Sequence, residues 1–136
     1  MAAIMALDYG MVRTGIAITD ELQIIASGLT TVATTDLDDF LSDYLKENNV
    51  GLLLIGQPKT LQNKKGQVED AIQEFIKKFT EKFPDIPIKR VDERFTSKIA
   101  FQSMIDSGMK KKKRRDKALV DEISATLILQ SYLYYQ

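Results

Sequence analysis

The sequence predicts an α/β domain with a mixed sheet, in which three antiparallel strands come first and parallel strands follow, with helices on both faces. Apolar, β-favouring runs separated by turn residues fill the first quarter of the chain. After them, short apolar runs alternate with segments whose apolar residues recur at helical three-and-four spacing. We expect residues 1–136 to form a single domain, because one hydrophobic core commonly serves about 100 to 150 residues.

The antiparallel strands are expected near the amino terminus. Residues 4–7 form an apolar run that ends at Asp8, Gly10 and Gly15 bracket a turn, and a second apolar run resumes at Gly15. This pattern predicts a hairpin. Residues 23–34 are rich in Ile, Val and Thr, which predicts a third strand that continues the meander.

A helix and a parallel strand come next. Thr35 is a candidate cap for a helix over about residues 36–48, and the acidic first turn of this helix suits the helix dipole. Its apolar residues share one face. They are Leu37, Phe40, Leu41, Tyr44 and Leu45. Residues 52–55 then form a short apolar run ended by Gly56, which is typical of a buried parallel strand after a helical crossover.

The remaining elements alternate until a long helix closes the chain. After a loop over residues 56–66, apolar spacing predicts a helix that ends at Pro84, followed by a strand over residues 86–91. A third helix is expected from Thr96 to about Gly108. The last helix, about residues 116–135, is apolar on nearly every side, so we expect it to pack between the sheet and other helices.

The composition restricts the chemistry that the chain can perform. The sequence contains no cysteine and no histidine, which excludes disulfide scaffolds, thiolate or imidazole metal sites, and Ser-His-Asp or Cys-His catalysis. Catalysis would have to use carboxylates, lysine, hydroxyl groups or a bound metal. The first apolar run is too short for a signal peptide or a spanning helix and has no basic flank, so we expect a cytoplasmic protein with no membrane partner.

Positive charge is concentrated in one segment although the chain is neutral overall. Lysine plus arginine and aspartate plus glutamate both number 19. Six consecutive cations nevertheless stand together, namely Lys110, Lys111, Lys112, Lys113, Arg114 and Arg115. Such a run can be a solvated loop without a partner, but beside a carboxylate cluster it could hold phosphates that the acids alone would repel. We therefore predict that it binds nucleic acid or a nucleotide.

Asp8 is the first candidate for a functional acid. It closes an apolar strand, and open α/β sheets commonly bind ligands at the carboxyl ends of their strands. The alternative is that Asp8 only caps a turn by accepting hydrogen bonds from nearby backbone amides.

Further acids occur near the end of a second strand and in the last helix. Glu93 shares alternation parity with Val91 and could face the same side as the core, although it could equally pair with its neighbours on the surface. Asp121 lies one and two turns below apolar residues of the last helix, and so does Glu122, so helical geometry alone does not choose between them. An inward acid needs a compensating partner, and a metal ion is one.

Three such carboxylates, from two strand ends and a helix, could converge on hard divalent cations, which prefer oxygen ligands. Without metal the clustered carboxylates would repel one another, and at least one of them would tend to hold a proton. With metal bound, all of them can ionise.

Three blocks of the sequence resemble the YqgF family, also described as Holliday junction resolvase-like. They are LDYGMVRTGIA over residues 7–17, VDERFTSKIA over residues 91–100, and KALVDEISATLILQSYL over residues 117–133. All three stand in the family's order, so the resemblance runs from end to end. It implies an RNase H-like fold and a metal-binding acidic triad, which carries over onto Asp8, Glu93 and Asp121 and favours Asp121 over Glu122. The chain departs from the family at Thr14, where an apolar residue is usual, and at Gln57, where leucine is usual.

The resemblance implies a hydrolase, a divalent-metal-dependent endo- or exonuclease acting on precursors of small-subunit ribosomal RNA. We predict two Mg²⁺ or Mn²⁺ ions, with Asp8 anchoring both ions and Glu93 and Asp121 each holding one. From their charge, Arg13, Arg94 and the cation run would position the substrate backbone. The lysines of the loop over residues 56–66 also suit a phosphate backbone.

Three other readings remain open. A resolvase acting on four-way DNA junctions would benefit from a twofold dimer, whereas an RNA-processing enzyme could be a monomer. A ribosome-assembly factor would keep the fold and the basic run, and would bind RNA or precursor particles without turnover. Asp8, Gly10 and Arg13 also resemble the phosphate-binding turn of actin and the sugar kinases, but those proteins have two domains, which the length of this chain opposes.

Overall fold

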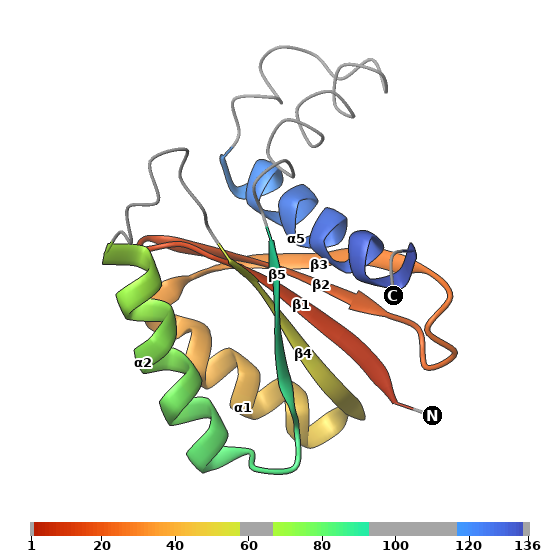
Figure 1. The fold of residues 1–136 in the computed structure, drawn as a ribbon, viewed down its shortest axis with the longest axis horizontal. Helices are drawn as coiled ribbons and strands as arrows, with labels where there is room; N and C mark the ends of the chain where they lie inside the picture. The colour runs from red at the N-terminus through yellow and green to blue at the C-terminus, as the bar shows by residue number, and fades with distance from the viewer. Residues whose placement is uncertain (1, 58–66, 93–116, 135–136) are drawn as a thin grey trace.

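The computed structural model describes residues 2–57, 67–92 and 117–134, and these build a five-stranded mixed sheet with helices on both faces (Figure 1). The strands run in the order β3-β2-β1-β4-β5, which makes β1 central. Strand β2 pairs antiparallel with both β1 and β3, while β4 is parallel to β1 and β5 is parallel to β4. The strands are β1 (Ala3–Tyr9), β2 (Arg13–Thr19), β3 (Ala26–Ala33), β4 (Val50–Gln57) and β5 (Ile88–Asp92). The predicted fold class is confirmed.

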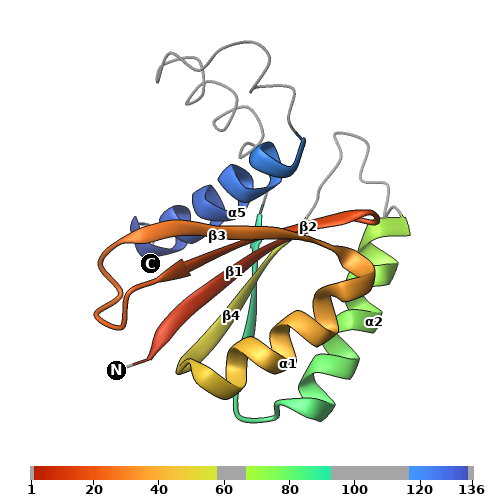
Figure 2. The same ribbon diagram turned by 180° about the vertical axis from the view of Figure 1, so that it is seen from behind.

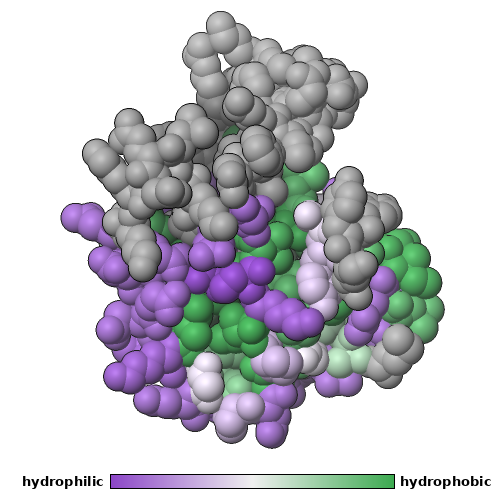
Figure 3. Space-filling view, in the orientation of Figure 1, coloured by the Kyte–Doolittle hydropathy of each residue, from purple (hydrophilic) through white to green (hydrophobic). Residues whose placement is uncertain are grey.

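The helices are divided between the two faces of the sheet. Helices α1 (Leu37–Glu47) and α2 (Gln67–Lys82) cover one face, and α5 (Lys117–Tyr134) crosses the other (Figures 1 and 2). The outer side of α2 is hydrophilic (Figure 3). None of the helices within the described ranges is both long enough and apolar enough to span a membrane.

Strand alternation separates two hydrophobic clusters. Met5 and Leu7 of β1 pack with the buried residues of α1 and α2, whereas Ile4 and Ala6 pack against α5. The α5 side of the core is completed by residues that are almost fully buried, namely Ala17, Leu54, Ala125, Ile128 and Leu129. Continued alternation therefore directs Asp8, two residues after Ala6, toward the face that α5 covers.

Some element boundaries differ from the prediction. Strand β2 begins at Arg13, so Gly15 lies inside the strand and not in the turn. Thr35 does not cap α1, because a short 3-10 helix, Thr34–Asp36, precedes α1 and Asp36 takes the cap position without a side-chain hydrogen bond. The physical reason is that Thr34 hydrogen-bonds to the β1–β2 turn through its backbone and its side chain.

The last helix also differs in its surroundings. Helix α5 packs on β1, β2 and β3, while α1 and α2 lie on the opposite face. The helices expected on its outer side are therefore not among those that the structure describes. The predicted helix over residues 96–108, the cation run, and residues 58–66 of the predicted loop lie outside the described residues.

Candidate active site

Asp8 lies near the carboxyl end of the central strand, where the sequence predicted a ligand-binding acid. The residue is half-buried, and its cross-strand partner in β2 is Gly15. Strand β4 runs parallel on the other side of β1, with Leu7 opposite Ile55. Asp8 therefore lies between two neighbouring strands, near the carboxyl end of the central strand.

Gly15 lets α5 approach the sheet at this point. A Cβ atom on Gly15 would lie 2.0 Å from the backbone carbonyl oxygen of Asp121 and 2.9 Å from the backbone nitrogen of Glu122. No side chain fits such a gap, and glycine inside a strand commonly marks a close backbone approach of this kind. The contact places Asp121 over the residue paired with Asp8. Two of the three predicted metal ligands are thus brought to neighbouring positions.

Asp121 forms an ion pair with Arg13. The Arg13 Nε donates to Asp121 Oδ2 at 3.2 Å, and the two side chains are 36% and 25% exposed. Arg13 is predicted to bind substrate, and the structure adds that its guanidinium orients the carboxylate of Asp121. Because only the Nε contact is made with Asp121, the geometry leaves the terminal nitrogens of Arg13 out of this pair.

Glu122, the alternative to Asp121, points to another part of the sheet. A Cβ atom on Gly28, in the edge strand β3, would lie 2.4 Å from Glu122 Oε1. Glu122 also lines a hollow of about 320 Å³ with Thr126 and Gln130 of α5. Its carboxylate therefore lies over β3, two strands away from Asp8. This direction agrees with the choice of Asp121 that the family resemblance favoured.

The turn between Asp8 and Arg13 is fixed by a chain of hydroxyl groups. Thr34 Oγ1 donates to the Gly10 carbonyl at 2.6 Å, and Thr14 Oγ1 lies 2.9 Å from Thr34 Oγ1. Because the single proton of Thr34 goes to Gly10, Thr14 must be the donor to Thr34. Thr14 is fully buried, so this bond explains how the chain tolerates a hydroxyl where the family usually has an apolar residue.

Replacing Thr34 with valine is expected to lower the free energy of unfolding by about 1 to 3 kcal/mol, because the buried Thr14 hydroxyl loses its acceptor. Thermal and urea denaturation measure the change. The matched control is Thr35→Val at the exposed neighbouring position, which should change stability by less than about 0.5 kcal/mol. Equal effects of the two variants would contradict the hydroxyl chain.

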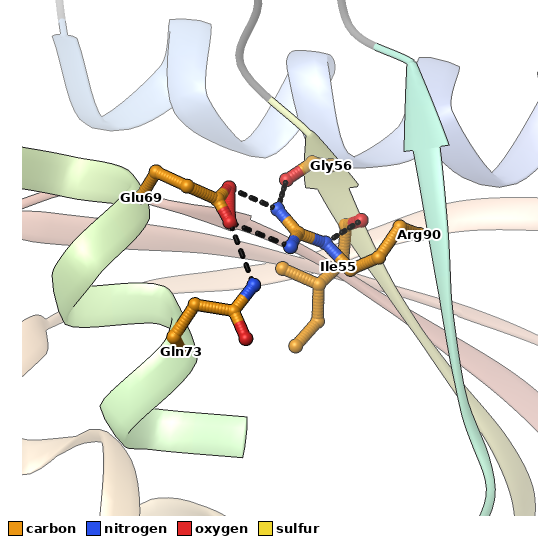
Figure 4. Close-up of polar contacts among 5 residues, drawn as sticks. All are labelled: Ile55, Gly56, Glu69, Gln73 and Arg90. Carbon is orange, nitrogen blue, oxygen red and sulfur yellow. Dashed lines mark hydrogen bonds and ion pairs between the residues drawn. The ribbon is translucent and has the colours of Figure 1, made fainter. Parts of the chain in front are cut away.

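A second polar cluster joins β4, β5 and α2 on the opposite face of the sheet (Figure 4). Arg90 Nη1 and Nη2 donate to the two carboxylate oxygens of Glu69 at 2.9 and 2.8 Å, and Gln73 donates to Glu69 as well. Arg90 also donates to the carbonyls of Ile55 and Gly56 at 3.3 and 3.0 Å. These contacts use four of the five N–H donors of Arg90, so its guanidinium is committed to Glu69 and to the carboxyl end of β4.

This cluster was not predicted from the sequence. A signal was present, because alternation with Ile88, a residue of the α1- and α2-side core, turns Arg90 inward, and an inward charge requires a partner. The identity of the partner could not be found in the same way. Glu69 lies 21 positions away, in the first turn of a helix whose acids also suit the helix dipole.

Replacing Glu69 with glutamine should lower the free energy of unfolding by about 2 kcal/mol, because the bidentate pair with Arg90 loses its charge and one acceptor. The pair is well protected, with side-chain exposures of 20% and 13%. Glu74→Gln, on the exposed side of the same helix, is the control. If the glutamine at position 74 costs as much stability as the one at position 69, the pair does not hold α2 to the sheet.

Tyr9 follows Asp8 but faces α1 and α2. Its ring packs 5.5 Å from that of Phe75, and burial, followed by the negative charge of Asp38, raises the pKa of its phenol above the ordinary value. The phenol is therefore protonated at neutral pH, and Tyr9 is not a general base.

Several predicted site residues lie outside the described ranges. These are Glu93, Arg94, Lys110, Lys111, Lys112, Lys113, Arg114 and Arg115. Val91, whose parity was used for Glu93, does pack with the core cluster on the α5 side. Within residues 2–57, 67–92 and 117–134, no group of three acids is close enough to hold a metal ion. The structure thus sets the backbone of Asp121 over Gly15, the cross-strand partner of Asp8, and the convergence of Asp8, Glu93 and Asp121 on a metal ion stays a prediction.

Comparison with known proteins assigns the family. A family model described as "RuvX: Holliday junction resolvase" matches residues 2–135. The chain belongs to the RuvX family. Two relatives of this RuvX chain carry the name "Putative pre-16S rRNA nuclease". The one from Christiangramia forsetii is 64% identical over 134 residues, covering 98% of this chain and 99% of the relative. The one from Flavobacterium psychrophilum is 60% identical over 133 residues, covering 98% and 97%.

Solved structures identify the fold of the RuvX chain. The fowlpox virus Holliday junction resolvase matches with a TM-score of 0.57 at 14% identity, covering 98% of this chain and 99% of the resolvase. RuvC from T. thermophilus, solved with a Holliday junction substrate, also has a TM-score of 0.57, at 12% identity, and the match covers 98% and 94% of the two chains. The RNase H-like fold implied by the sequence blocks is confirmed.

Proposed function

We propose that this RuvX protein is a divalent-metal-dependent nuclease that hydrolyses phosphodiester bonds in structured RNA, with the precursor of 16S ribosomal RNA as its substrate in the cytoplasm. The observation that supports the proposal is the close approach at Gly15, where the backbone of Asp121 lies over the residue that pairs with Asp8 near the end of the central strand. The names of the relatives support the choice of substrate.

The donor atoms fit hard divalent cations. Asp8 and Asp121 offer carboxylate oxygens, the ligands that Mg²⁺ and Mn²⁺ prefer, and Glu93 is the proposed third ligand. Two bound ions would supply an activated water and charge stabilisation at the leaving oxygen.

The cationic side chains would bind and orient the phosphate backbone. Arg13 holds Asp121 through Nε and can offer its terminal nitrogens to a phosphate oxygen. Arg94 and the cation run of residues 110–115 would neutralise phosphates further along the strand, which the acids alone would repel. Binding should therefore weaken steeply as salt concentration rises.

The second candidate is a resolvase that cuts four-way DNA junctions. The description of the matching family and the two solved resolvases with this fold favour it. A resolvase must cut two strands symmetrically and would act as a twofold dimer, whereas cleavage of one RNA strand requires only a monomer. Measurement of mass in solution, free and with each substrate, separates the two candidates.

The test compares isosteric amides at adjacent positions of α5. Asp121→Asn removes a proposed ligand and should lower kcat for Mg²⁺- or Mn²⁺-dependent cleavage of a 16S precursor fragment by more than about 100-fold, since even partners behind the ligands cost roughly 10- to 100-fold. Glu122→Gln also removes one negative charge, but from a side chain that lies over β3, and this variant should retain activity. A four-way junction is assayed in parallel.

Each outcome selects one reading. Cleavage of RNA that Asp121→Asn abolishes and Glu122→Gln preserves supports the proposed nuclease, and the same pattern on the junction alone supports a resolvase. If the wild-type protein binds RNA and cuts neither substrate with either metal, the nuclease proposal is wrong and a ribosome-assembly factor replaces it.

A further inference from the structure

The turn between β1 and β2 carries two exposed apolar side chains. Met11 is 52% exposed and Val12 is 68% exposed, although both are large hydrophobic residues. They form the tip of the turn, which lies at the end of the sheet where α2 begins (Figures 1 and 2). Single exposed apolar residues are common on protein surfaces, but two adjacent ones beside charged groups can form part of a binding surface.

Hydrogen bonds hold this apolar tip in place. The backbone nitrogen of Thr34 donates to the Val12 carbonyl at 2.9 Å, and the Thr34 hydroxyl donates to the Gly10 carbonyl at 2.6 Å. A Cβ atom on Gly10 would lie 2.5 Å from the Arg13 carbonyl oxygen, so the turn is also tight. Thr34 thus holds both ends of the turn by hydrogen bonds, and the tip presents Met11 and Val12 to solvent in a defined orientation.

The tip adjoins the proposed active site. Along the chain it is flanked by Asp8 and by Arg13, whose guanidinium reaches Asp121. A phosphate bound there would bring its own nucleotide within reach of the turn. The side chains of Met11 and Val12 carry no hydrogen-bond donor for a phosphate or for the hydrated backbone of a duplex, but they complement the apolar face of a base that has left its stack.

We propose that Met11 and Val12 contact an unpaired nucleobase next to the scissile phosphate. The inference rests on the proposed nuclease function and narrows its substrate class. It selects nucleic acid that has unstacked nucleotides at the cleavage point and disfavours a continuous duplex. The acids and Arg13 would act on the phosphate, and the apolar tip would recognise that the adjoining base is free.

The chain contains a matched control at the opposite end of the hairpin. Leu22, Ile24 and Ile25, in the turn between β2 and β3, are 64%, 67% and 63% exposed, and this turn lies in the apolar area at the right of Figure 3. It is also fixed, because Asp20 Oδ1 accepts hydrogen bonds from the backbone nitrogens of Ile24 and Ile25 at 2.8 and 2.9 Å. The two turns share exposure and rigidity and differ in their distance from Asp8.

The test measures equilibrium binding in an Asp8→Asn background, in which the substrate is not cut. The probes are two RNA hairpins with one 2-aminopurine, placed either in a single-nucleotide bulge or opposite uridine in the stem. Met11→Ser combined with Val12→Ser should weaken binding of the bulged hairpin roughly tenfold, which is within the range for losing the contact to one base. Its 2-aminopurine fluorescence change should also disappear, while binding of the paired hairpin stays the same. Leu22→Ser combined with Ile24→Ser should change neither hairpin.

The outcomes separate this inference from the function on which it rests. If the serine pair at 11 and 12 weakens both hairpins equally, or neither, the base contact is refuted, whatever the cleavage assay shows. If the bulge-specific loss occurs but wild-type protein cuts no substrate, the base contact stands and the nuclease function fails. Thermal denaturation of both serine pairs should match the parent, because all four side chains are exposed.

Discussion

Replacing Asp8 with asparagine is expected to abolish metal-dependent cleavage, lowering kcat by more than about 100-fold, because the change removes a charged ligand from the proposed metal site. The fold should be unaffected. Asparagine has nearly the same shape as aspartate, and Asp8 is only half-buried, so the substitution neither leaves a cavity nor overpacks its surroundings. Steady-state kinetics with varied Mg²⁺, together with thermal denaturation, measure both effects.

Asp20→Asn is the control for this prediction. Asp20 follows β2 at the other end of the hairpin and caps a turn, which is the alternative role considered for Asp8. Hydrogen bonds from Ile25 and Ile24 lower the pKa of Asp20, and both reach Oδ1, which an asparagine side chain also provides. The control should therefore cleave RNA at the wild-type rate. If the Asp8→Asn variant has the wild-type kcat, Asp8 is not a metal ligand, and its role is to cap a turn, as that of Asp20 is.

The strand pattern was predictable because burial imposes alternation on each strand. Residues 4–7 read as an apolar run, and the structure distributes them over two faces, with Met5 toward α1 and α2 and Ala6 toward α5. The same alternation places Asp8 on the face that Ala6 occupies, and the structure shows that α5 covers this face. The helical crossover before residues 52–55 predicted that this strand would be parallel, and the structure shows that its parallel partners are β1 and β5.

Contacts between distant segments were not predictable in this way. The pairing of Arg90 with Glu69 joins a strand to a helix, and neither residue carries a local sign of the other. Thr34 was expected to end a strand, but its hydroxyl bonds to Gly10, 24 positions earlier, and this contact moved the start of α1. The choice between Asp121 and Glu122 required knowledge of where α5 crosses the sheet, which helical periodicity does not contain.

Gly15 is the clearest case of a residue whose role depends on the tertiary structure. The sequence places it after a turn, where glycine usually supplies unusual backbone angles. In the structure it lies in the middle of a ladder, paired with Asp8 on one side and Thr31 on the other. Gly15 is required there because it has no side chain, which allows the backbone of α5 to approach β2 closely.

Gly15→Ala is therefore expected to lower the free energy of unfolding by about 3 kcal/mol, at the upper end of the range for overpacked sites, because the new methyl group would meet backbone atoms that cannot rotate away. Gly28→Ala is the control. There the added Cβ would meet only side-chain atoms of Glu122, including Cγ at 2.7 Å, and this side chain can rotate whereas the α5 backbone cannot, so the loss of stability should be at most about 1 kcal/mol. Because α5 must move to admit the methyl group at position 15, Asp121 would shift away from Asp8, and metal-dependent cleavage should fall even at temperatures where the variant is fully folded. A folded Gly15→Ala variant with unchanged kcat and unchanged Mg²⁺ dependence would mean that the close approach of α5 does not position Asp121 for catalysis.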